Sequence, residues 1–218
     1  MGAVIGDLLP LAVGVAVSPI PIIAAILMLL SKRAGTTSVG FAIGWLAGIV
    51  VATTIFVALA GTISSSDGPS TTSSLIKIVL GVLLLAVGVR QWRGRTGEHA
   101  TPKWMTAIDD LTAAKGFGLA FALAAINPKN LLMCVAAGVT IGGASLSVGQ
   151  QVGAVAVFTV IAASTVAIPV IGYLVAAQRL RAPLDALKQW LQTNNATVMA
   201  VLILVIGIVL IGKGIGGL

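Results

Sequence analysis

Charged residues are scarce in this sequence, and acidic residues are the scarcest. Of the 218 residues, 9% are charged, only 6 are Asp or Glu, and 58% are hydrophobic. Soluble domains carry roughly 25% charged residues. Together with a mean hydropathy of +1.10, this excludes an ordinary soluble domain and indicates an integral membrane protein. The length suits one compact bundle of membrane helices.

Cysteine and histidine occur once each. Cys134 lies inside an apolar run, so a single chain can form neither a disulfide nor a cysteine-based metal site. His99 lies in a polar loop, where a solvated side chain is a simpler interpretation than a ligand or a catalytic base. We expect no metal site and no other cofactor.

Apart from Asp7, which lies near the end of the first apolar segment, no Asp, Glu or His lies within an apolar segment. Transporters of divalent metals or organic cations are expected to place carboxylates or imidazoles along their path. No phosphate-binding loop of an ATPase is present either. Asp109 and Asp110 are the only candidates for interfacial hydrolase or transferase chemistry, and an exposed acidic helix face explains them better. We therefore expect no enzyme.

Six apolar segments are long enough, or nearly so, for the ~20 residues that cross the hydrocarbon core. They span residues 4–30, 38–61, 74–91, 116–141, 149–177 and 195–217. The fifth contains Pro169 and is long enough to tilt or kink. The sequence therefore predicts an all-α membrane protein with six transmembrane helices.

The basic residues are distributed unevenly among the loops. Ten of the 13 Lys and Arg residues lie in or beside the first, third and fifth loops. The positive-inside rule therefore places loops 31–37, 92–115 and 178–194 in the cytoplasm and both termini outside. The net charge of +7 is thus a topology signal and does not indicate a nucleic-acid partner. The first 30 residues lack a basic start, so we expect no cleavable signal peptide.

Two of these loops have the pattern of short amphipathic helices. One follows Thr101-Pro102 and places Trp104 and Leu111 on an apolar face; the other follows Pro183, with Leu184, Leu187, Trp190 and Leu191 on one side. We expect both helices to rest on lipid headgroups. A gating or partner-docking role is the alternative.

Two apolar segments are interrupted near their middles by polar and proline-containing motifs. The fourth contains Asn127-Pro128-Lys129-Asn130, and the first contains Ser18-Pro19-Ile20-Pro21. Proline removes a backbone donor and clashes with the preceding turn. A mid-bilayer lysine costs roughly 2.5–3.5 kcal/mol. We therefore predict that helices 1 and 4 are broken at these motifs.

The two motifs are related by a shift of 109 residues, which also superposes Ser38 on Ser147, Gly40 on Gly149 and Gly44 on Gly153. With three spans in each half, this predicts a 3+3 inverted-topology repeat, the plan of many secondary transporters. The predicted organisation is a first three-helix repeat over 1–91, a cytoplasmic linker with an amphipathic helix over 92–115, and a second repeat over 116–218.

Paired helix breaks favour a binding site at the midplane. Ser18 and Asn127 precede prolines and are good N-caps, so each following half-helix directs its free N–H groups inward. Lys129 adds the only buried charge and is the only intramembrane group able to carry a proton. The substrate should therefore carry a phosphate, sulfate or carboxylate. The candidate substrate-binding residues are Ser18, Pro19, Pro21, Asn127, Pro128, Lys129 and Asn130. Packing kinks are the alternative explanation of the prolines.

Small and hydroxyl side chains in the spans have simpler interpretations. Gly40, Gly44 and Gly48 recur at four-residue spacing, which predicts close helix packing within or between protomers. Thr53, Thr54, Ser164 and Thr165 are expected to bond back to their own helices. Lining a transport pathway is the alternative role for these hydroxyls.

On these motifs, the chain resembles the LysE (lysine exporter) superfamily of small six-span proteins, and most resembles its GAP/Sap branch, named for glycopeptidolipid and sulfolipid addressing. The Ser-Pro-Ile-Pro-Ile and Asn-Pro-Lys-Asn-Leu strings carry the resemblance, which covers essentially the whole chain. Amino-acid exporters of the superfamily more often have Pro-Gly-Pro in the first span. Ile20 replaces that glycine, which argues against amino-acid export.

The resemblance implies a transporter or flippase that exports an anionic lipid or other anionic cell-envelope compound by alternating access. It implies a homodimer among the lipids of the cytoplasmic (inner) membrane. Two alternatives remain open. One is an exporter of amino acids or similar small solutes, and the other is a non-transporting scaffold for a lipid-export complex.

Overall fold

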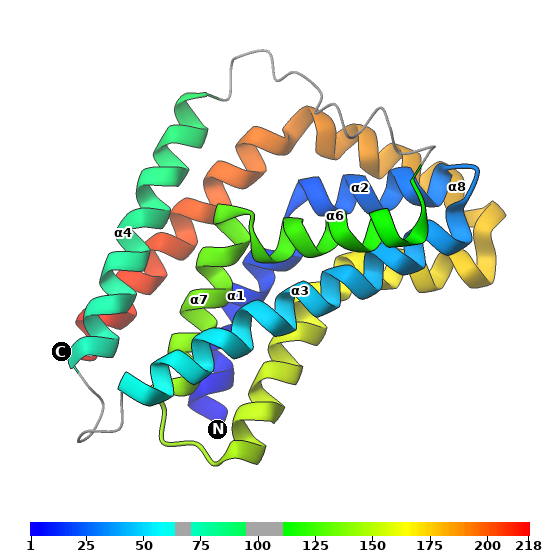
Figure 1. Cartoon of the computed structure of the whole chain (residues 1–218). Coiled ribbons are helices and arrows are strands. Elements are labelled where there is room, and N and C mark those ends of the chain that lie inside the picture. Colours follow the sequence, from blue (N-terminus) through cyan, green and yellow to red (C-terminus); the bar gives the residue numbers. More distant parts are fainter. Residues whose placement is uncertain (64–70, 95–110) are drawn as a thin grey trace.

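A computed structural model describes residues 1–63, 71–94 and 111–218 (Figure 1). Within these ranges the regular structure is helical and contains no strand. The helices are α1 (Gly2–Ala16), α2 (Pro19–Leu30), α3 (Ala34–Ile63), α4 (Thr71–Arg93), α6 (Ala113–Ala125), α7 (Pro128–Gly142) and α8 (Val148–Ile215). The all-α prediction is confirmed. The surface helix predicted after Thr101-Pro102 lies outside the described residues.

Both predicted helix breaks are present. α1 and α2 meet at an angle of 51°, and α6 and α7 meet at 63°. Each second half-helix begins at a proline, Pro19 or Pro128, because proline is tolerated in a first turn, where its missing N–H leaves no bond unmade. The segments 4–30 and 116–141 are therefore bent pairs of helices.

Three helices are long and apolar enough to cross a membrane by themselves: α3, α4 and α8. The number rises to five if each bent pair is counted as one span. α8 has 68 residues and contains a non-helical residue, Ala176, with φ −143° and ψ 48°. The segments 149–177 and 195–217 both lie in α8, which changes direction along its course (Figure 1). The chain is a multi-pass membrane protein, and its division into six spans stays a prediction.

Packing between the helices brings the two broken pairs into the centre of the bundle. α3 packs on α6 and α7, α8 packs on α1, α2 and α4, and α1 contacts α7. One large buried cluster includes Leu11 and Val15 of α1, Trp45 of α3, Met133 of α7 and Ile206 of α8. The last turn of α1 and the side chains of Lys129 and Asn130 in α7 are therefore buried, whereas Ile126 at the end of α6 is 68% exposed.

The glycine spacing of α3 has a direct packing role. A Cβ on Gly40, Gly44 or Gly48 would lie 2.4, 2.2 or 2.7 Å from atoms of Ala113, Phe117 or Ala124 of α6. Since those separations are far below normal contact distances, only glycine allows the backbones of α3 and α6 to approach so closely. The prediction of close packing is confirmed, and the contact is within the chain.

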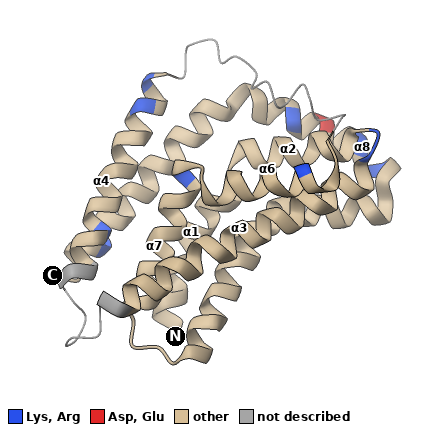
Figure 2. Ribbon diagram, in the orientation of Figure 1, with Lys and Arg blue, Asp and Glu red and all other residues tan. Residues whose placement is uncertain are grey.

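Basic residues concentrate at one end of the bundle. Lys and Arg positions gather around the end where α2 turns into α3 and at the upper end of α4, and few lie toward the end that holds both termini (Figure 2). This separation matches the charge segregation seen among the loops.

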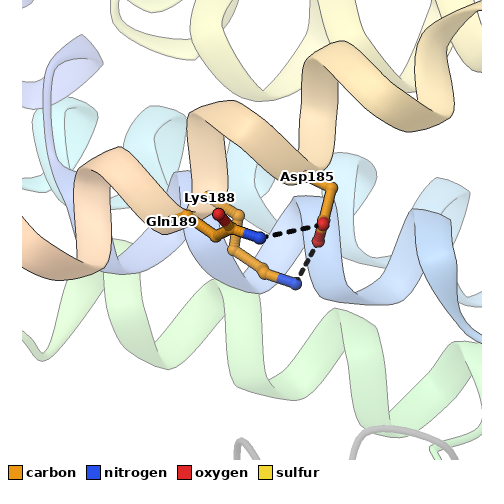
Figure 3. Close-up of polar contacts among 3 residues, drawn as sticks. All are labelled: Asp185, Lys188 and Gln189. Atoms are coloured by element: carbon orange, nitrogen blue, oxygen red, sulfur yellow. Dashed lines mark hydrogen bonds and ion pairs between the residues drawn. The ribbon is translucent and has the colours of Figure 1, made fainter.

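The segment after Pro183 differs from the surface helix that its sequence predicts. It continues α8, and its Asp185 accepts hydrogen bonds from Lys188 and, over 3.1 Å, from Gln189 (Figure 3). Leu184 and Leu191 are buried in a cluster with Ile22, Ile26 and other residues of α2. Leu187 and Trp190 remain exposed. One part of the apolar face therefore packs on α2, which has apolar side chains at this end, and the other part is exposed at the surface of the bundle.

Candidate functional site

The site is built around the first turn of α7. Asn127 has extended backbone geometry, φ −61° and ψ 120°, and its Oδ1 accepts a hydrogen bond from the Lys129 N–H over 3.1 Å. Its backbone oxygen also accepts from the Leu131 N–H over 2.8 Å. Asn127 is thus a side-chain N-cap, as predicted.

The equivalent residue of α2 behaves differently. Ser18 also has extended geometry, φ −75° and ψ 110°, and is buried, but its side chain makes no capping hydrogen bond. Its backbone oxygen accepts from the Ile22 N–H over 3.4 Å. Of the two expected side-chain N-caps, the one at Asn127 is present and the one at Ser18 is not. Pro19 and Pro21 are buried in the first turn of α2.

Lys129 crosses from α7 to the end of α1. Its residue exposure is 3%, and its Nζ donates a hydrogen bond to the carbonyl oxygen of Gly14 over 2.6 Å. Gly14 lies in the last turn of α1, where free carbonyls and the helix dipole concentrate negative potential. Within the described residues the ion pairs are Lys188–Asp185 and Lys213–Asp7, so no described carboxylate balances the Lys129 charge.

Asn130 makes the corresponding link to the end of α6. Its Nδ2 donates to the carbonyl oxygen of Leu123 over 2.9 Å, while its buried Oδ1 has no hydrogen-bond partner. Leu123 follows Gly14 by 109 residues, the shift that relates the two motifs. Consecutive side chains of α7 therefore hold equivalent carbonyls at the ends of both first half-helices. Ile20 and Pro21 stand in the matching places of α2 and cannot donate from their side chains.

A second side chain reaches the end of α1, this time from α8. The Thr165 hydroxyl donates to the carbonyl oxygen of Ala16. The expectation that this hydroxyl bonds to its own helix is therefore wrong, because α8 passes close enough to offer it a free helix-end carbonyl. Ser164 does bond to its own helix, through the Ile161 carbonyl oxygen.

The structure brings together Lys129, Asn130 and the carbonyls of Gly14 and Leu123. The motif residues were visible in the sequence, but their acceptors were not, because a backbone carbonyl carries no side-chain signal. Gly14 has a packing reason for its identity, since a Cβ there would lie 2.3 Å from Ile206 and 2.8 Å from Met133. The one usable signal was the repeat, which pairs Gly14 with Leu123.

The chemistry of this arrangement is that of a buried cation at a helix terminus. An ammonium has three donors, of which Gly14 accepts one. An oxyanion could accept hydrogen bonds from the others. Within the described ranges, no three His, Cys, Asp or Glu side chains gather in a way that could hold a metal ion.

Residues 8–216 match the model of a protein family described as Sap, sulfolipid-1-addressing protein. The match covers both helix breaks and nearly all of the bundle. No curated protein and no solved structure matches the chain.

Proposed function

The chain belongs to the Sap, sulfolipid-1-addressing protein, family, and from this premise we propose that it is a secondary transporter or flippase for an anionic lipid. Its substrate would be a lipid-linked cell-envelope compound, moved outward across the cytoplasmic membrane. The resemblance of both proline motifs to those of the LysE superfamily supports the same mechanism.

The observation that carries this proposal is the buried ammonium of Lys129 on the Gly14 carbonyl oxygen. A lysine at mid-bilayer depth costs roughly 2.5–3.5 kcal/mol. A hydrogen bond from a charged donor returns about 1.5–3 kcal/mol. Because the two terms nearly cancel, the link gives the fold little net stability. A group that adds little stability yet places a positive charge between two helix breaks is suited to binding an anion.

On binding, the substrate anion would replace the Gly14 carbonyl oxygen as the hydrogen-bond acceptor of the Lys129 ammonium. The headgroup oxyanion would accept hydrogen bonds from Lys129, assisted by the free N–H groups that begin α7 and α2. As the ammonium turns toward the anion, its bond to the Gly14 carbonyl weakens, and the last turn of α1 loses one of the two hydrogen bonds that it accepts from described side chains. The remaining contact, from Thr165, belongs to α8. Binding would thereby loosen α1 from α7, which lets one half of the bundle rock against the other.

The orientation in the membrane follows from the distribution of charge. The basic end of the bundle would face the cytoplasm and the termini would lie outside. The inverted repeat would give each break an equivalent route to one leaflet. As in the superfamily that the motifs resemble, we expect a homodimer to be the transporting unit.

Reconstituted vesicles would test this function. Phosphatidylglycerol with a fluorescent acyl chain is placed in both leaflets, and the fraction exposed outside is followed by quenching with dithionite. We expect the protein to accelerate the exchange of this anionic probe, and to act more weakly on phosphatidylcholine carrying the same label. A Lys129→Met variant should lose the acceleration. Equal rates for both probes, or an active variant, would contradict the proposal.

A second candidate function has one observation in its favour. Lys129 and Asn130 both direct donors at carbonyls of the chain itself, which a scaffold could use to hold helix ends together. A non-transporting scaffold predicts no lipid exchange in vesicles by the wild-type protein. It also predicts that the Lys129→Met variant loses thermal stability. Efflux of amino acids without lipid exchange would instead favour a solute exporter.

A further inference from the structure

A groove of about 350 Å³ lies between α3 and the beginning of α8. Among the described residues, eight line it, and six of these are aliphatic. The eight are Val50, Thr54, Val57, Ala58, Val148, Gln151, Val152 and Val155. Its volume is near the lower limit of small-molecule sites, which begin at about 300 Å³. The groove belongs to two apolar helices, so its lining favours an apolar occupant.

The groove runs along the helices from one end of the bundle toward its middle. Val148 begins α8, and Val50 lies eight residues before Ala58 in α3. At 1.5 Å per residue the groove is therefore ~12 Å long on its α3 side. This is most of one leaflet, since the hydrocarbon core is ~30 Å thick. Its length suits an extended acyl chain lying along the helices.

The opposite end of the α3 and α8 pair is closed. A shift of 109 residues carries Val50 and Thr54, which are exposed, onto Thr159 and Ala163, which are 5% and 1% exposed. The same shift relates Val148 and Gln151 to Val39 and Ala42, which pack against a cluster that includes Leu184 and Leu191. Protein side chains therefore occupy one end, and the space at the other end is left for lipid.

Helix α7 connects the groove with the candidate anion site. A Cβ on Gly138 of α7 would lie 2.9 Å from the backbone oxygen of Thr53, the neighbour of the groove residue Thr54. Lys129 precedes Gly138 by nine residues in α7, a distance of ~14 Å along the helix. A single lipid could therefore reach Lys129 with its headgroup while one of its chains follows the groove.

We propose that the groove between α3 and α8 is a binding site for one acyl chain of the transported lipid. This inference rests on the proposed function, which supplies the headgroup at Lys129. Among the described residues that line the groove, Thr54 and Gln151 are polar, and the Gln151 amide already donates to the Leu146 carbonyl oxygen over 3.3 Å. The groove therefore offers few hydrogen bonds to a polar ligand, and its aliphatic lining suits an alkyl chain.

Photocrosslinking tests the proposal directly. The wild-type protein is reconstituted in phosphatidylcholine vesicles with a small fraction of phosphatidylglycerol that carries a diazirine in its acyl chain, and labelled peptides are mapped by mass spectrometry. We expect labelling to concentrate in residues 50–58 and 148–155, to saturate with probe, and to be displaced by unlabelled phosphatidylglycerol. Uniform labelling of lipid-facing positions, Val160 and Ile168 among them, would mean annular lipid only and would overturn the proposal.

Two matched tryptophan variants connect the groove with transport. Val152→Trp should fill the groove and lose both the labelling of residues 50–58 and the lipid exchange. Val160→Trp, at a side chain of the same helix that is 69% exposed and outside the groove, should retain both. If Val152→Trp keeps labelling and exchange, the inference fails.

A lysine variant separates this failure from failure of the proposed function. In Lys129→Met, groove labelling should persist while exchange is lost, and phosphatidylglycerol should displace the probe no better than phosphatidylcholine. Saturable labelling in a wild-type protein that moves no lipid would retain the chain site and contradict transport. Lipid exchange by a wild-type protein whose groove is not labelled would support transport and contradict the acyl-chain site.

Discussion

Lys129 of α7 donates its side-chain hydrogen bond to the backbone oxygen of Gly14 in α1, over 2.6 Å, and joins the two broken helices in the interior of the bundle. The donor lies at the beginning of one half-helix, and the acceptor lies at the end of another. A positive charge at a helix C-terminus is favourable, so this contact lets the protein keep an ammonium without a buried carboxylate.

Replacing Lys129 with methionine should separate function from folding. The change removes a charge and keeps an apolar stem of similar length. Since a substrate anion would lose a charge-assisted hydrogen bond worth about 1.5–3 kcal/mol, we expect lipid exchange to fall by about 10- to 150-fold. The melting temperature in detergent should stay the same or rise, because burying a charge is costly.

Lys213→Met is the matched control for this change. Lys213 pairs with Asp7 over 2.7 Å in a partly exposed position near the end of the bundle. A pair of this kind contributes about 0–1 kcal/mol. Exchange should be retained. If both variants lose lipid exchange equally, the loss in Lys129→Met comes from the lower net charge of the protein and not from the anion site.

The two helix breaks should respond unequally to removal of their N-cap side chains. Asn127→Ala deletes the bond that Oδ1 accepts from the Lys129 N–H and should cost about 0.5–2 kcal/mol. Ser18→Ala deletes no capping bond and should cost less. The melting temperatures of the two variants give the comparison. Equal losses would show that the Ser18 hydroxyl has a structural role that its geometry does not reveal.

Glycines related by the 109-residue shift should also respond differently. Gly40→Ala places a Cβ 2.4 Å from the Ala113 oxygen and should destabilise the protein by about 1–3 kcal/mol, because α3 and α6 must move apart. Gly149→Ala meets no atom within 4 Å and should be neutral or stabilising by up to about 1 kcal/mol. Thermal unfolding of both variants tests this. A tolerated Gly40→Ala would mean that the α3–α6 contact is looser than the structure has it.

The orientation in the membrane can be tested by labelling with an impermeant thiol reagent. Ser145→Cys lies in the turn between α7 and α8, and Lys32→Cys lies in the turn between α2 and α3; both side chains are exposed. Reagent added to intact cells should label the first and spare the second until the membrane is opened. Cys134 is buried and serves as an unreactive background. Labelling in the opposite order would place the termini in the cytoplasm.

Most of the fold could be predicted from patterns that depend only on the local chain. Hydropathy located every apolar segment, because the cost of burying polar groups in hydrocarbon acts on each stretch independently. Proline located both helix breaks, since it removes a backbone donor wherever it occurs. The motifs also led to the family. The six-span count, the inverted repeat and the anion-binding role of the motif residues remain predictions.

The contacts of the site had to come from the tertiary structure. Thr165 was expected to bond within its helix, yet it binds the Ala16 carbonyl oxygen, because the close approach of α8 to α1 offers a free acceptor. The helix after Pro183 was expected on the headgroups, yet Leu184 and Leu191 pack on α2. The sequence by itself determined that the chain is helical, lies in a membrane, breaks at two prolines and buries one lysine. Only the tertiary structure decided that this lysine binds the end of α1, because its acceptor is a backbone carbonyl 115 residues away.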